Sequence, residues 1–155
     1  RGVYERISGQ MEAAGYPLYA QHVDAMDTGT LVDIFRAEEN ACLLGTDAAR
    51  DGVDVPGRSL RLIVFDRAPW PRPDILHKAR REHFGKRLYD DRITRLRLAQ
   101  ASGRLLRRAD DTGVLVILHP RTPTRLFDGL PEGAAPVRLG LADAVAGVAE
   151  FLENH

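Results

Sequence analysis

The chain has 155 residues, of which 44% are hydrophobic and 28% are charged, with equal numbers of basic and acidic side chains. These values fit one globular domain spanning residues 1–155 and exclude disordered and collagenous chains. A membrane span is also excluded, because no apolar run approaches the roughly 18–20 residues that a membrane helix needs. Cys42 is the only cysteine, so internal disulfides and thiolate metal clusters are ruled out. We expect a protein of the cytoplasm.

Hydrophobic spacing predicts alternating helices and strands in the first 45 residues. A helix is expected over residues 3–14, followed by a short strand over 17–20. Thr28 can cap a second helix that runs to residue 37. The continuous apolar run at 41–45 is typical of a strand buried on both faces of a parallel sheet.

The same alternation continues to the end of the chain. Residues 60–65 and 114–118 form two more continuous apolar runs and are predicted strands. The other predicted elements are helices over 74–84, 91–107 and 141–152, a helical turn over 123–127 and a loop over 129–136. Strands separated by helices indicate an α/β sandwich of three layers with a mostly parallel sheet. Such domains normally begin with a strand, so we expect the first strand to be missing and the chain to be a fragment of a larger protein.

Charge is distributed unevenly along the chain. Residues 58–108 hold 15 Arg or Lys and five acids, a net charge of +10, and the rest of the chain carries −10. This asymmetry predicts a basic surface that can meet phosphate, with Arg80, Arg81 and Arg95 as candidate contacts. The alternative is an ordinary solvated surface whose arginines reflect coding bias.

A glycine and two arginines follow one face of the helix predicted over residues 91–107. At 100° per residue, Gln100, Gly103, Arg104 and Arg107 form a single stripe. A glycine inside a helix costs about 1 kcal/mol relative to alanine, so we expect another group to approach the backbone closely there. A solvated arginine face with a chance glycine is the alternative.

A loop rich in glycine and aspartate follows the strand predicted at 41–45. It reads Gly45-Thr-Asp-Ala-Ala-Arg-Asp-Gly-Val-Asp-Val-Pro-Gly57. Ligands of open α/β sheets bind outside the carboxyl ends of the strands, where this loop would lie. Taken alone, the same composition also fits an ordinary turn.

Together these segments resemble superfamily 2 helicases of the DinG and XPD type. The loop pattern Gly-Thr-x4-Asp-Gly-Val-Asp-Val-Pro-Gly is similar to motif V of that family, and Gln-x2-Gly-Arg-x2-Arg is similar to motif VI. The segment Leu62-Ile-Val-Phe-Asp-Arg-Ala-Pro-Trp-Pro-Arg-Pro-Asp74 resembles the family's strand with its Pro-aromatic and Pro-x-Asp positions. Residues 110–121 resemble its Asp-x-Gly, strand and Asp-x-Arg, so the likeness covers residues 41–127.

The resemblance implies the second RecA-like motor domain of an ATP-dependent DNA helicase. Its arginines, matched here by Arg104 and Arg107, would cross to a triphosphate held by the first motor domain, where a planar guanidinium stabilises phosphoryl transfer. The partners implied are single-stranded DNA and that first domain, and the cofactors are ATP and Mg²⁺. The remaining positions assigned by match are Gln100, Gly103, Asp51, Gly52 and Asp54 to the nucleotide, and Thr46 to nucleic acid. Which motif V residues touch which ligand is left open.

Some family features are changed or missing. His119 stands where the family has an acid before x-Arg, which leaves the ion pairing of the nearby arginine open. Neither a Gly-x4-Gly-Lys-[Ser/Thr] phosphate loop nor an Asp-Glu-x-His sequence is found, so we expect the chain alone to hydrolyse no ATP. The five histidines form no metal-binding pair, and no metal site is predicted. The rival interpretation is a degenerate RecA-like module that binds nucleic acid or a protein without catalysis.

Overall fold

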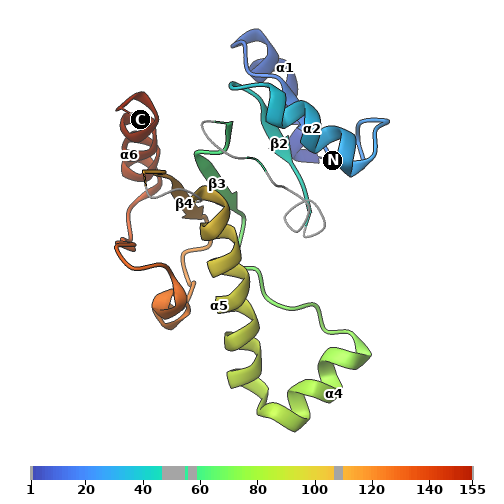
Figure 1. Cartoon of the computed structure of the whole chain (residues 1–155), viewed down its shortest axis with the longest axis vertical. Helices are drawn as coiled ribbons and strands as arrows, with labels where there is room; N and C mark the ends of the chain where they lie inside the picture. Colours follow the sequence, from blue (N-terminus) through green and yellow to red (C-terminus); the bar gives the residue numbers. More distant parts are fainter. Residues whose placement is uncertain (1, 47–54, 56–58, 107–109, 155) are drawn as a thin grey trace. The chain divides into compact units, whose positions relative to one another are not determined.

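The computed structural model describes residues 2–46, 55, 59–106 and 110–154 (Figure 1). The chain divides into two compact units, Arg1–Leu60 and Arg61–His155. Each unit combines helices with a pair of parallel strands, which confirms the predicted α/β class. That the two units together make one domain remains a prediction from the sequence.

The first unit contains two helices and two short strands. They are α1 (Gly2–Ala13), β1 (Leu18–Ala20), α2 (Thr28–Ala37) and β2 (Cys42–Leu44). Leu18 pairs with Cys42 and Ala20 with Leu44, so both strands end at the same edge of the sheet. Asp27, rather than the predicted Thr28, caps α2, because its carboxylate accepts a hydrogen bond of 3.1 Å from the Thr30 backbone N–H.

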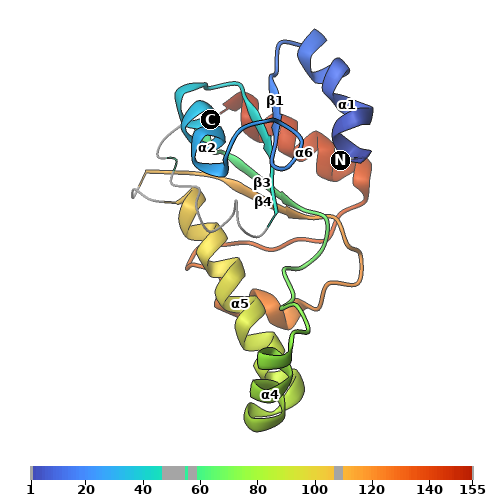
Figure 2. The ribbon, with the colours of Figure 1, turned by 90° about the vertical axis from the view of Figure 1, so that its right-hand side faces the viewer.

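The second unit carries the longer helices. Its elements are β3 (Leu62–Phe65), α4 (Ile75–Phe84), α5 (Lys86–Leu105), β4 (Val114–Ile117), the 3-10 helix η2 (Thr124–Gly129) and α6 (Leu141–Asn154). Strands β3 and β4 lie side by side and parallel, with Leu62 opposite Val114 (Figure 2). The core of the unit consists of Ala68, Leu98 and Leu126, with Phe65, Leu115, Ile117, Phe127 and Leu130 packed around them.

Helix α5 begins five residues before the predicted position. Gly85, at φ 85°, ends α4 and is followed at once by α5, so a single glycine in the left-handed region joins the two helices. Figure 1 shows this junction at the end of α5 that is remote from β3 and β4. The sequence suggests a helix start at Asp91, but that residue lies inside α5 and its carboxylate is buried.

Helix α6 closes the second unit. The Arg61 guanidinium donates a hydrogen bond of 3.0 Å from Nη1 to the carbonyl of Leu152, which ties the end of this helix to the start of the unit. Apolar side chains on α6 remain exposed, among them Leu141 and Val145. In the part of the chain that the structure describes, no helix has both the length and the apolarity needed to cross a membrane.

Candidate functional site

One face of α5 is buried in the second unit. Asp91, Thr94, Leu98, Ala101 and Leu105 follow one another at steps of three and four residues, and all are nearly inaccessible to solvent. This spacing places them on a single helical face. Leu98 packs in the core of the unit, against which side chains of β3 and β4 also pack. The packing of this face therefore fixes the rotation of α5 about its own axis.

The polar groups on that buried face have hydrogen-bond partners, two of them within α5 and one in η2. Thr94 donates a hydrogen bond of 2.8 Å to the carbonyl of Asp90, and Ser102 donates one of 3.0 Å to the carbonyl of Leu98. Asp91 accepts two hydrogen bonds, of 2.7 and 3.1 Å, from the Arg125 guanidinium of η2. This pairing holds the pKa of Asp91 below its usual range and raises the pKa of Arg125. A charged contact therefore joins α5 to η2.

The opposite face of α5 carries the predicted stripe. Gln100 and Gly103 are exposed, and Arg104 is half-buried with its Nε atom closed off from solvent. A Cβ added at Gly103 would meet nothing within 4 Å, so this part of the helix surface is open. The close approach predicted at Gly103 is therefore not made by any described residue of the chain itself.

The helix ends before the last residue of the predicted stripe. Leu106 has left the helical region at φ −119° and ψ 82°, and its N–H donates a hydrogen bond of 3.0 Å to the Ser102 carbonyl. The prediction of a helix to residue 107 is wrong by two residues. Arg107 lies outside the described residues, so the structure brings together Gln100, Gly103 and Arg104.

At the end of β2, Thr46 is held by a residue that the sequence does not single out. The carboxamide oxygen of Gln21 accepts hydrogen bonds from the Thr46 backbone N–H, at 2.9 Å, and from its hydroxyl, at 2.8 Å. The Nε2 group of Gln21 donates to the Thr28 hydroxyl at 2.9 Å. Gln21 follows β1, and its own N–H donates to the carbonyl of Leu44 at 2.9 Å. The parallel pairing of β1 and β2 thus places Gln21 beside the start of the Gly/Asp-rich loop.

The far end of the same loop is anchored in the core of the first unit. Val55 is only 1% exposed and packs with Val32 and Phe35. An apolar residue inside a Gly/Asp-rich segment is the sequence signal for such an anchor. Asp51, Gly52 and Asp54, predicted to serve the nucleotide site, lie outside the described residues.

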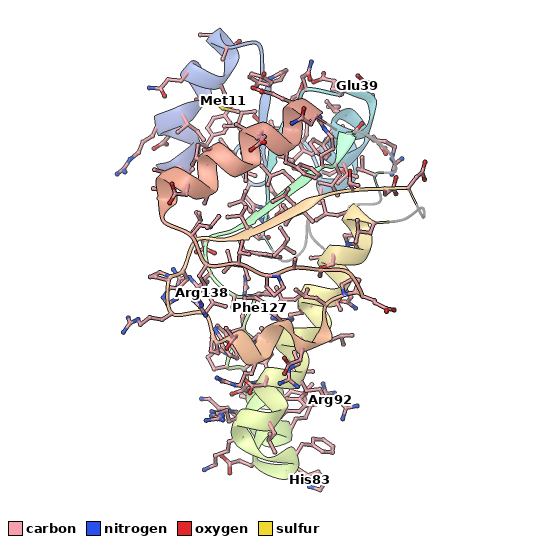
Figure 3. The ribbon with its side chains drawn as sticks, turned by 90° about the vertical axis from the view of Figure 1, so that its left-hand side faces the viewer. Met11, Glu39, His83, Arg92, Phe127 and Arg138 are labelled. Atoms are coloured by element: carbon pink, nitrogen blue, oxygen red, sulfur yellow. The ribbon has the colours of Figure 1, made fainter. Side chains whose placement is uncertain are left out.

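The basic segment contains basic side chains of two kinds. Some support the fold: Arg81 contacts the Asp90 carboxylate at 2.7 Å, and Arg95 donates a hydrogen bond of 2.9 Å to the Arg125 carbonyl. Lys78, Arg80 and Arg92 are exposed and form no salt bridge within the described ranges; Arg92 projects from the side of α5 (Figure 3). Of the three predicted nucleic-acid contacts, only Arg80 therefore has its charge exposed and unpaired in the described part.

A second group of arginines lines a recess after β4. The recess has a volume of about 470 Å³ and is lined by Pro120, Arg121, Thr122, Pro123, Thr124, Arg125 and Arg138. Arg125 is paired with Asp91, and Arg138 donates hydrogen bonds to the carbonyls of Pro120 and Thr122. Arg121 is exposed and forms no salt bridge within the described residues. His119 contributes its carbonyl, which accepts from the Thr122 hydroxyl at 2.9 Å, so the turn is held without the acid that the family pattern has there.

Metal-ligating and nucleophilic groups are scattered. Among the described residues, no three His, Cys, Asp or Glu side chains gather where they could hold a metal ion. Burial raises the pKa of the Cys42 thiol, which keeps it protonated at neutral pH.

Comparison with known proteins gives a consistent result. Residues 1–132 match the helicase C-terminal domain family. The chain is 39% identical over 132 residues to the ATP-dependent helicase DinG of Mycobacterium tuberculosis (strain ATCC 25177 / H37Ra), which covers 81% of the chain and 20% of the relative. It is 36% identical over 141 residues to the 3'-5' exonuclease DinG of Bacillus subtilis (strain 168), covering 83% of the chain and 15% of the relative. It is 40% identical over 109 residues to the ATP-dependent DNA helicase YoaA of Escherichia coli (strain K12), covering 64% and 17%.

The chain thus spans about a fifth or less of the length of these relatives. No solved structure matches it. The family match covers residues 1–132, a range that contains the stripe on α5 and the edge of β1 and β2. The chain therefore belongs to the helicase C-terminal domain family and is related to the DinG-type helicases.

Proposed function

We propose that this chain is the second motor domain of an ATP-dependent DNA helicase that translocates on single-stranded DNA. The observation that carries the proposal is the stripe on α5 formed by the exposed Gln100 and Gly103 and the half-buried Arg104. The opposite face of α5 is packed in the core of the second unit. The surface at Gly103 is open to a group outside the described chain. Such a surface suits a second protein domain that presents a nucleotide.

Arg104 is the residue best suited to act on the nucleotide. A guanidinium is permanently charged and planar, so it can donate two parallel hydrogen bonds to phosphate oxygens. Partial burial of the Arg104 side chain limits its conformations, which reduces the entropy lost when it engages a phosphate. Arg107 takes the second arginine position of the motif in this proposal.

The residues present fit a nucleotide only in part. Gln100 and Arg104 would contact ATP from one side, and Asp51, Gly52 and Asp54 are proposed to complete the contact from motif V. The described residues offer no carboxylate cluster for Mg²⁺. We assign the magnesium ligands and the phosphate loop to the first motor domain, where bound ATP supplies the phosphoryl group.

Single-stranded DNA is the proposed nucleic-acid partner. The exposed cations Lys78, Arg80 and Arg92 form no salt bridge with the described residues, so they can neutralise backbone phosphates without breaking one there. Thr46, at the edge formed by β1 and β2, is proposed as a further contact.

Replacing Arg104 with lysine in the full-length protein tests the proposal. Lysine keeps the charge but loses the planar fork, so DNA-stimulated ATPase should fall severely. Arginine fingers in other phosphoryl-transfer enzymes contribute about 10³–10⁵ in rate, which sets the scale of the expected loss. The melting temperature and single-stranded DNA binding should stay near those of the wild type.

A matched arginine on the same helix serves as the control. Arg97 donates hydrogen bonds from Nη1 to the carbonyls of Pro69 and Trp70, which is a structural task. R97K should therefore lower ATPase only in step with stability. If R104K retains most of its ATPase, the catalytic assignment is wrong, and a wild-type protein that binds DNA without hydrolysing ATP would favour the non-catalytic rival.

A further inference from the structure

The hydroxyl and backbone N–H of Thr46 are already engaged in this structure. Both donate to one atom, the carboxamide oxygen of Gln21, at 2.8 and 2.9 Å. The orientation of the amide follows from chemistry, because a backbone N–H can only donate and must face the oxygen of the carboxamide. The Nε2 group then faces the Thr28 hydroxyl, to which it donates at 2.9 Å.

This arrangement conflicts with a phosphate contact at the same threonine. A phosphate oxygen is an acceptor only, so it needs a donor from Thr46. A threonine has one hydroxyl proton and one backbone N–H, and Gln21 accepts both. A phosphate can bind Thr46 through these donors only if the carboxamide oxygen leaves.

We infer that the carboxamide oxygen of Gln21 occupies a phosphate position at the donor pair of Thr46, and that a nucleic-acid phosphate exchanges with it on binding. The inference rests on the proposed function, because it takes Thr46 as a contact to the DNA backbone. The phosphate should make the stronger hydrogen bonds to Thr46, since a hydrogen bond to an ionised oxygen is roughly twice as strong as one to a neutral carboxamide.

The backbone around Gln21 keeps the carboxamide in this place. Gln21 N–H extends the pairing of β1 and β2 through its hydrogen bond to Leu44, and His22 turns the chain at φ 65°, in the left-handed region. The Asp24 carboxylate accepts a hydrogen bond of 2.7 Å from the Ala20 N–H across this turn. Because Gln21 also binds Thr28, at the first residue of α2, the exchange would alter a contact to that helix.

Two substitutions at Gln21 should change DNA affinity in opposite directions. Gln21→Leu frees both donors of Thr46, so the full-length protein should bind labelled single-stranded oligothymidylate about three- to tenfold more tightly. Gln21→Glu keeps the acceptor and adds a negative charge that repels phosphate, so it should bind more weakly. In a Thr46→Val background the gain from Gln21→Leu should shrink, because only the backbone N–H is left to release.

Two controls separate this exchange from general effects of the substitutions. Thr28→Val removes only the second hydrogen bond of Gln21 and leaves both Thr46 donors engaged, so it should raise affinity less than Gln21→Leu does. Gln10→Leu makes the same chemical change at an exposed position of α1 and should have no effect.

Fluorescence anisotropy at low salt gives the affinities, and a melting temperature shows that each variant folds. If the wild type binds and Gln21→Leu binds equally or more weakly, the inference is overturned while the proposed function stands. If Gln21→Leu does not fold, Gln21→Glu decides, and equal or tighter binding overturns the inference. A wild type that does not bind the oligonucleotide refutes the proposed function and the inference with it.

Discussion

The ion pair between Asp91 and Arg125 should stabilise the second unit through α5, and Asp91→Asn tests this. Asparagine has nearly the same shape but no charge, so it leaves the Arg125 guanidinium without its carboxylate. The Asp91 side chain is 5% exposed and that of Arg125 is 36% exposed. Breaking a fully buried pair costs about 3–5 kcal/mol and an exposed pair contributes about 0–1 kcal/mol. Because one side chain of this pair is buried and the other is partly exposed, we expect Asp91→Asn to lower the free energy of unfolding by about 2 kcal/mol, between these limits.

The stability that Asp91→Asn removes should be smaller in acid than at neutral pH. Hydrogen bonding to Arg125 lowers the pKa of Asp91 in the folded state, so the carboxylate contributes stability above the usual carboxyl range. That contribution is lost as the pH falls below about 4 and through the lowered pKa. The difference in unfolding free energy between the wild type and Asp91→Asn should therefore be constant at neutral pH and should shrink in acid.

Urea unfolding of both proteins at pH 7 and at pH 3 measures this difference. Asp128→Asn is the matched control, because its carboxylate is 70% exposed and lies 3.5 Å from Arg95, so no measurable loss is expected. A difference that is negligible at pH 7, or that does not shrink at pH 3, would refute the stabilising role of the pair.

Two glycines in and after α5 should respond in opposite ways to alanine. Gly103→Ala should raise stability by about 1 kcal/mol, because nothing occupies the space, yet it should lower ATPase if another domain approaches there. Gly113→Ala should destabilise by about 1–3 kcal/mol, since its Cβ would lie 2.8 Å from the Leu105 Cβ; denaturation and ATPase assays that show both variants alike would contradict this. Charge reversal at Lys78, Arg80 or Arg92 should weaken binding to single-stranded DNA and reduce its salt dependence by about 0.7 in log–log slope for each phosphate that is no longer neutralised. Arg81→Glu should instead reduce stability through repulsion from Asp90, and equal effects on DNA binding at all four positions would show that ion pairing is irrelevant.

Much of the local structure follows from the sequence alone. The strands predicted over 60–65 and 114–118 are found at 62–65 and 114–117, and Asp74, at the start of the helix predicted over 74–84, caps α4 by accepting a hydrogen bond from the His77 N–H. Both features depend on residues close together in the chain, where side-chain period and capping chemistry dominate. The two segments that resemble helicase motifs V and VI are also local patterns, and the family match confirms the family that was assigned from them.

The tertiary structure decided the features that depend on distant partners. Asp91 looks like the start of a helix but lies within α5, and its carboxylate pairs with Arg125, 34 residues away. Gln21 becomes part of the site only because parallel pairing of β1 and β2 places it beside Thr46, 25 residues later. A sequence pattern reports which residues share an element, whereas these contacts depend on which elements pack together. Packing also decides which arginines can bind a ligand. A guanidinium that is paired with a carboxylate of the fold must break that ion pair before it can bind a phosphate.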